Sequence, residues 1–86
     1  MFFTVYVIQN QSGKIYIGQT INLLNRLARH NGELPSKSRS FTKLNKGPWT
    51  LVYSEKHNSR KSAMEREREL KSSRGRQFIK DLLQNK

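Results

Sequence analysis

The sequence contains no cysteine and only two prolines, and its acids are few: six Asp plus Glu against seventeen Lys plus Arg. Without cysteine, disulfides, thiolate zinc sites and cysteine nucleophiles are excluded. No run approaches the roughly 20 apolar residues that span a bilayer. The start, MFFTVYVIQN, has no positively charged lead, so we expect no signal peptide. These absences favour a reducing, intracellular setting, and we expect a cytoplasmic protein.

Positive charge is the strongest global signal. The net charge is +11 over 86 residues, a length that suits one small domain, residues 1–86. A field of this sign attracts polyanions and speeds encounter with them. We therefore expect a nucleic acid as the partner, and an acidic protein or a membrane surface is the alternative.

Hydrophobic patterning predicts the element order ββα-loop-βαα, an α+β domain with a small antiparallel sheet. A basic loop, GELPSKSRSFTKLNKG, separates the two halves. Ser62 and Glu65 have the spacing of a capping box near the start of the second helix. Leu23, Leu24 and Leu27 form an apolar stripe on the first helix. Strands are expected at 2–8, 14–18 and 48–54, and helices at 21–31, at about 59 or 62 to 72, and at 74–84.

The turn NQSG sets the register of the first hairpin. Asn10 and Gly13 fit a type I turn with a three-residue loop, in which the glycine takes a positive φ. This register places Tyr6 opposite Gly18, and it brings Tyr6 and Tyr16 onto the same face as diagonal neighbours. Two phenols beside a position without a side chain could form a site. The alternative is that both rings only pack the sheet.

Helical spacing adds polar groups near this hairpin. Arg26 and His30 are four residues apart, so they are neighbours either in a site or on a solvated face. With two histidines and no cysteine, a zinc site is not expected. In SAMERERELK, Glu67 shares a helical face with Ala63 and Leu70, so we expect it to be held against the domain. It is either an ion-pair partner of Lys71 or a ligand for a hard cation such as Mg²⁺.

In this order, Tyr6 in TVYVI, Tyr16-Ile17-Gly18, Arg26, His30 and Glu67 resemble the GIY-YIG nuclease domain. The blocks GKIYIGQTINLLNRLARHN, PWTLVYSE and SAMERERELK resemble those of the compact single-domain bacterial members. The first motif departs from the family, since it reads Thr4-Val5-Tyr6 rather than Gly-Ile-Tyr. Family members often have a C-terminal asparagine in the site, but Asn85 fits no pattern and receives no role.

The resemblance implies a three-stranded antiparallel sheet flanked by helices and cleavage of DNA phosphodiester bonds with one divalent ion. It implies that Glu67 holds Mg²⁺ or Mn²⁺ and that Arg26 clamps the scissile phosphate. Tyr16 is the preferred proton acceptor, with Tyr6 and His30 in orienting roles. A phenol with an ordinary pKa of about 10 is a poor base at neutral pH, so nearby cations, including Lys14, are expected to assist.

No attached DNA-binding domain is recognised, so we expect an endonuclease directed by DNA structure or strand rather than sequence. The alternative is a weakly active or inactive nucleic-acid-binding module of the same fold that serves a protein partner. Trp49 and Phe41 could stack on bases, although core packing is favoured for both. Contacts that position the phosphates without reading sequence are expected from Lys14, Lys37, Arg39, Lys43, Lys46, Arg60, Lys61, Arg74 and Arg76.

Overall fold

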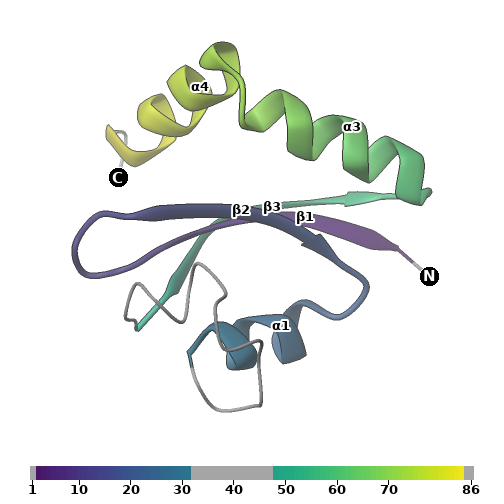
Figure 1. Cartoon of the computed structure of the whole chain (residues 1–86), viewed down its shortest axis with the longest axis horizontal. Helices are drawn as coiled ribbons and strands as arrows, with labels where there is room; N and C mark the ends of the chain where they lie inside the picture. Colours follow the sequence, from purple (N-terminus) through teal and green to yellow (C-terminus); the bar gives the residue numbers. More distant parts are fainter. Residues whose placement is uncertain (1, 32–47, 85–86) are drawn as a thin grey trace.

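The fold is taken from a computed structural model, which describes residues 2–31 and 48–84. Its centre is a three-stranded antiparallel sheet in the order β2-β1-β3 (Figure 1). The central strand β1, Phe3–Gln9, has four consecutive buried residues, as a strand covered on both faces requires. The other two strands are β2, Ile15–Thr20, and β3, Thr50–His57.

The predicted hairpin register is confirmed. Tyr6 pairs with Gly18 and Ile8 pairs with Tyr16, and Gly13 takes a φ of 84° in the turn. Buried Asn10 holds this turn, since its side-chain oxygen accepts hydrogen bonds from the backbone N–H groups of Ser12 and Lys14, at 3.0 and 2.8 Å. The turn is therefore an Asx-type structure whose length fixes which side chains of β2 face each side of the sheet.

Helices cover both faces of the sheet. Helix α1, Leu23–His30, lies on one face, and helices α3, Arg60–Leu70, and α4, Ser73–Gln84, lie on the other (Figure 1). The predicted capping box at Ser62 is wrong, because Ser59 is the N-cap of α3 and its hydroxyl accepts from the Ser62 N–H. The Ser62 hydroxyl instead bonds His57 Nδ1 at 2.6 Å.

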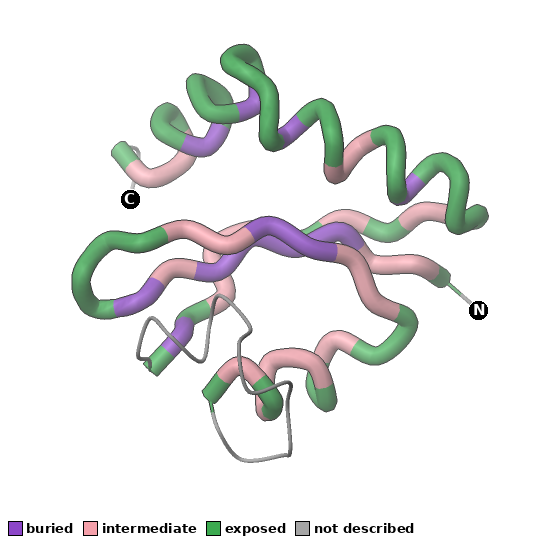
Figure 2. The backbone as a smooth tube through the Cα atoms, in the orientation of Figure 1, coloured by how far each residue is buried: buried purple, intermediate pink, exposed green. Residues whose placement is uncertain are grey.

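The core is split by the sheet, with buried residues along the middle of the strands and on the inner side of α3 and α4 (Figure 2). On the α1 face, Leu23 and Leu27 pack against a buried group that includes Tyr6 and Trp49. The expected leucine stripe is only partly correct, since Leu24 is 81% exposed. The other core unites Val5, Val7, Ile17, Ala63, Leu70 and Ile79.

The observed elements confirm the expected α+β class, although β3 begins and ends later than predicted. Pro48 precedes this strand rather than opening it. Trp49 is buried, as expected, and Phe41 lies outside the described residues. Within residues 2–31 and 48–84, no helix has the length and apolar character needed to cross a bilayer.

Candidate active site

The Tyr6 hydroxyl is the centre of a polar group on the α1 face. Tyr6 is fully buried, and its oxygen accepts a hydrogen bond from Arg26 Nε at 3.2 Å. The same oxygen lies 2.8 Å from His30 Nε2. The tautomer of the imidazole determines which of the two groups donates in this second hydrogen bond. Arg26 and His30 therefore fix the hydroxyl from two sides.

Helix α1 presents Arg26 and His30 to the tyrosine because both its ends are fixed. Asn22 is the N-cap and accepts from the Asn25 N–H at 3.1 Å. At the other end, the Asn31 side-chain amide donates to the Trp49 carbonyl at 3.2 Å and accepts from the Trp49 N–H. The predicted spacing of four residues then places Arg26 and His30 side by side on the buried side of the helix.

Tyr16 completes the group from the edge strand β2. Its ring centroid lies 6.2 Å from that of Tyr6 and 4.8 Å from that of His30. Gly18 permits this arrangement, since a Cβ there would lie 2.8 Å from the Tyr6 oxygen and 3.0 Å from Tyr16 Cε1. The space above the glycine is therefore taken by the two rings. We call Tyr6, Tyr16, Arg26 and His30 the α1-face cluster.

Arg26 is the cationic side chain of the cluster at neutral pH. Burial, together with the nearby Arg26 charge, lowers the pKa of His30 to about 4, so its imidazole is neutral. Burial raises the pKa of Tyr6 to about 12 against the opposing hydrogen bond from Arg26, so the phenol is neutral too. Hydrogen bonding to Tyr6 raises the pKa of Arg26 despite burial. Among the described residues, Arg26 forms no ion pair with a carboxylate.

Glu67 lies on α3, across the sheet edge from this cluster. Its helical neighbours Ala63 and Leu70 are fully buried, as expected, and its own side chain is 24% exposed. The predicted ion pair with Lys71 is present, with Lys71 Nζ 2.8 Å from Glu67 Oε2. No hydrogen bond joins Glu67 to a described residue of the cluster, although its charge contributes to the raised pKa of Tyr6.

Glu67 is a described carboxylate whose charge acts on the cluster, and a carboxylate suits a hard cation. Within the described ranges, no three His, Cys, Asp or Glu side chains converge to form a cage for a metal ion. A partly exposed carboxylate completed by water and phosphate oxygens is nevertheless an ordinary arrangement for Mg²⁺. The residues present therefore fit a weakly held divalent ion, provided that Glu67 exchanges or shares its contact with Lys71.

The predicted phosphate-contacting residues are dispersed. Lys14 is exposed and precedes β2, Arg60 and Lys61 are exposed in the first turn of α3, and Arg74 and Arg76 are exposed in the first turn of α4. Of these five, Arg76 lines a groove beside Tyr16. Lys37, Arg39, Lys43 and Lys46 lie outside the described residues.

Sequence reasoning missed Lys80, which lines the same groove as Arg76. The signal was available, because residues 76 and 80 are four apart on one helix and share a face with apolar Ile79 and Leu83. It also missed the Asn31 contact to Trp49, which depends on chain segments 18 residues apart and has no local signature.

The sequence also matches a family model. Residues 2–80 match the model described as the GIY-YIG catalytic domain. This match covers most of the 86-residue chain, and it includes every member of the α1-face cluster and Glu67. The chain therefore belongs to the GIY-YIG catalytic domain family, the nuclease family whose resemblance was noted in the sequence.

Relatives and a solved structure agree with this assignment. UPF0213 protein SH2523 of Staphylococcus haemolyticus is 36% identical over 76 residues, which cover 88% of each chain. A structure-specific endonuclease subunit SLX1 homolog of Leishmania infantum is 40% identical over 55 residues, 59% of this chain and 8% of that protein. The solution structure of UPF0213 protein BH0048 from Bacillus halodurans has a TM-score of 0.55 at 27% identity, over 95% of this chain and 85% of the other.

Proposed function

We propose that this protein is an endonuclease that hydrolyses DNA phosphodiester bonds at the α1-face cluster, with Glu67 holding Mg²⁺ or Mn²⁺. The observation that carries the proposal is the state of Arg26. Its Nε is fixed on the Tyr6 hydroxyl at 3.2 Å, and among the described residues no carboxylate pairs with it. A phosphodiester carries one negative charge, so it can serve as the anionic partner of such a guanidinium.

Tyr16 is the proton acceptor in this proposal, and Tyr6 and His30 are orienting groups. Tyr6 is unsuited to act as a base, because burial raises its pKa to about 12 and the hydroxyl lies between Arg26 and His30. Tyr16 is half-buried on the edge strand, and both tyrosines interact electrostatically with Arg26. Neutral His30 forms a hydrogen bond with the Tyr6 hydroxyl and leaves Arg26 as the cluster's cation.

The reaction would proceed by attack of water on phosphorus. A bond forms between the water oxygen and phosphorus, and one P–O ester bond breaks. The Tyr16 phenolate takes the proton of the attacking water, while Arg26 holds a non-bridging phosphate oxygen and stabilises the charge that accumulates there. The departing oxygen takes its proton from solvent. A divalent ion at Glu67 would supply additional charge stabilisation for the leaving oxygen.

Support for DNA as substrate comes from the net charge of +11 and from the relative named as a structure-specific endonuclease subunit. We propose that cleavage depends on DNA structure rather than sequence, and that a protein partner contributes targeting.

The test is a cleavage panel over duplex, flapped, branched and single-stranded DNA, with Mg²⁺ or Mn²⁺. We expect Glu67→Ala and Tyr16→Phe each to lose at least about 100-fold in cleavage while DNA binding persists. Glu65→Ala and Tyr53→Phe are matched controls, since Glu65 is exposed on the same helix and Tyr53 lies on the opposite face of the sheet.

Equal cleavage by wild type and Glu67→Ala would contradict the proposal. Salt-dependent binding with no cleavage of any substrate would instead favour a binding module that serves a partner.

A further inference from the structure

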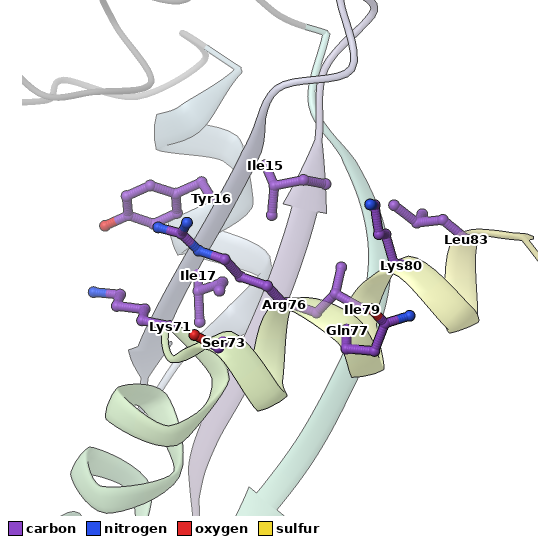
Figure 3. Close-up of a pocket in the computed structure, with 10 residues that line it drawn as sticks. All are labelled: Ile15, Tyr16, Ile17, Lys71, Ser73, Arg76, Gln77, Ile79, Lys80 and Leu83. Atoms are coloured by element: carbon purple, nitrogen blue, oxygen red, sulfur yellow. The ribbon is translucent and has the colours of Figure 1, made fainter.

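A groove of about 770 Å³ runs between the edge strand β2 and helix α4. Strand β2 contributes Ile15, Tyr16 and Ile17 to its walls, and α4 contributes Arg76 and Ile79 among others. Figure 3 shows Arg76 extending from α4 towards β2, on the side of the groove where Tyr16 lies. Tyr16, which lies on the edge strand, is therefore shared by the groove and the α1-face cluster.

The lining combines an apolar floor with a cationic rim. Three isoleucines and Leu83 form the apolar part, while Lys71, Arg76 and Lys80 carry positive charge, and no acid is among the lining residues that the structure describes. Lys71 already pairs with Glu67, so Arg76 and Lys80 are the rim cations that no described carboxylate neutralises. A ligand that matches this lining has flat apolar faces joined to negative charges.

An unstacked nucleic-acid strand has this chemistry, because its bases offer apolar faces and its phosphates offer one negative charge each. A base inside a duplex is stacked and paired, so it cannot reach the isoleucine floor unless it is unpaired or flipped. The volume of about 770 Å³ lies within the usual range of a small-molecule site, which is about 300–1,000 Å³. An extended peptide is the alternative ligand, since it can pair with the edge of β2. The cationic lining, in which no described residue is an acid, favours a polyanion over such a peptide.

We propose that the groove between β2 and α4 binds the unpaired strand next to the scissile phosphate. Bases lie on the isoleucine floor, and Arg76 and Lys80 hold the phosphates. The preferred substrate is then DNA with unpaired nucleotides beside the cleavage point, such as a flap or a junction between duplex and single strand. The part that concerns cleavage rests on the proposed function, whereas the part that concerns binding does not.

The binding test uses Glu67→Ala protein without divalent ions, so that no cleavage intervenes. The probes are a fluorescent single strand of about 10 nucleotides, a duplex of the same length and the single strand with abasic nucleotides. Arg76→Ala is compared with Arg74→Ala, because both arginines are exposed in the first turn of α4 and only Arg76 is among the groove's lining residues.

We expect Arg76→Ala to weaken binding of the single strand about tenfold, while Arg74→Ala weakens both probes equally and by roughly twofold. Abasic substitution should lower single-strand affinity by roughly tenfold in the Glu67→Ala protein. Equal effects of the two arginine variants, or duplex binding as tight as single-strand binding, would overturn the inference. A groove that takes a peptide would also overturn it, since Arg76→Ala would then leave oligonucleotide binding unchanged.

A cleavage experiment separates the two proposals. If Glu67-dependent cleavage is found but Arg76→Ala cuts flapped DNA as well as Arg74→Ala does, the groove inference fails and the proposed function stands. If no DNA is cut but the selective effect of Arg76→Ala on single-strand binding is found, the proposed nuclease function fails and the groove assignment is supported.

Discussion

Two clusters built on tyrosine, arginine and histidine lie on opposite faces of the same sheet. On the face that packs against α3, the Glu55 carboxylate accepts from the Tyr53 hydroxyl at 2.6 Å and from Arg66 Nε at 3.0 Å, and its other oxygen lies 2.5 Å from His57 Nε2. We call Tyr53, Glu55, His57 and Arg66 the β3–α3 cluster. The α1-face cluster has the same three side-chain types, but Tyr6 occupies its centre in place of a carboxylate.

The central group decides what each cluster can do. Burial alone would raise the pKa of Glu55, but hydrogen bonds from Tyr53, Arg66 and His57 outweigh it and the pKa is lowered. The positive charge of Arg66 is thus neutralised within the protein, and the β3–α3 cluster fastens α3 to the sheet. Tyr6 is neutral and cannot neutralise Arg26 in this way. The contrast assigns the first cluster to the fold and leaves the second able to hold an anion.

Replacing each arginine by glutamine should separate the two roles most strongly. We expect Arg26→Gln to lower DNA cleavage by about 10²–10³-fold, because the charge that stabilises the reacting phosphate is lost. Arg66→Gln should leave cleavage nearly unchanged and lower the free energy of unfolding by about 1–2 kcal/mol, because Glu55 loses a partner. Rates on a flapped substrate and urea denaturation of both variants measure this. Comparable loss of activity in both would remove the distinction.

A carboxylate placed in the α1-face cluster should neutralise Arg26, as Glu55 neutralises Arg66 in the β3–α3 cluster. His30→Gln keeps a neutral hydrogen-bonding partner for the Tyr6 hydroxyl, whereas His30→Glu puts a negative charge four residues after Arg26. We expect His30→Gln to lose about tenfold in cleavage and His30→Glu to lose roughly another tenfold, because its carboxylate competes with the phosphate for Arg26. The two variants differ in charge and little in size. Equal activity would show that the Arg26 charge is not what matters.

The positions of the α1-face cluster residues could be predicted from the sequence, because they depend on local signals. Tyr6, Tyr16 and Gly18 were placed correctly because the Asn10–Gly13 turn is a local signal that fixes the register. Arg26 and His30 followed from helical spacing. Glu67 was correctly placed on the inner side of α3, because its neighbours Ala63 and Leu70 are apolar at helical spacing.

The β3–α3 cluster was not predicted, because its contacts are between β3 and α3 and depend on how the helix packs. Glu55 and Arg66 are 11 residues apart, and no periodicity links them. The polar sequence EKH, residues 55–57, did not suggest a strand, yet these residues pair with β1, because backbone hydrogen bonds between strands do not depend on side-chain polarity. Ser59 is the N-cap of α3, and the Ser62 hydroxyl forms a hydrogen bond with His57 Nδ1 instead of capping the helix.

A smaller effect concerns stability and pH. The pKa of His30 is about 4 in the folded protein, against an ordinary value of 6.5, because burial and the Arg26 charge disfavour its cation. As the pH falls below 6.5, the unfolded chain binds this proton first, so stability present above that pH is lost progressively towards pH 4. His30→Gln lacks this contribution.

Between neutral pH and pH 4, we expect the free energy of unfolding to fall by about 1 kcal/mol more in the wild type than in His30→Gln. This value is smaller than the full pKa difference would give, because His30 is only half-buried and solvent screens its charge. Urea denaturation at several pH values measures the difference. Parallel curves for the two proteins would contradict the assignment of a neutral His30.

Glu55 and Glu67 differ in how firmly the protein holds their charge, and this difference gives the smallest predicted effect. Glu55 is held by three side chains, whereas Glu67 is held by Lys71, whose side chain is 53% exposed. An exposed ion pair contributes at most about 1 kcal/mol, so a cation at Glu67 has little to displace. Lys71→Met should therefore tighten Mn²⁺ binding by roughly two- to fivefold in the absence of DNA.

Mn²⁺ titration followed by electron paramagnetic resonance measures this affinity. Glu67→Gln is the variant expected to abolish binding, and Lys61→Met is the matched control. Unchanged affinity in Lys71→Met would show that the Glu67–Lys71 pair does not compete with the metal ion.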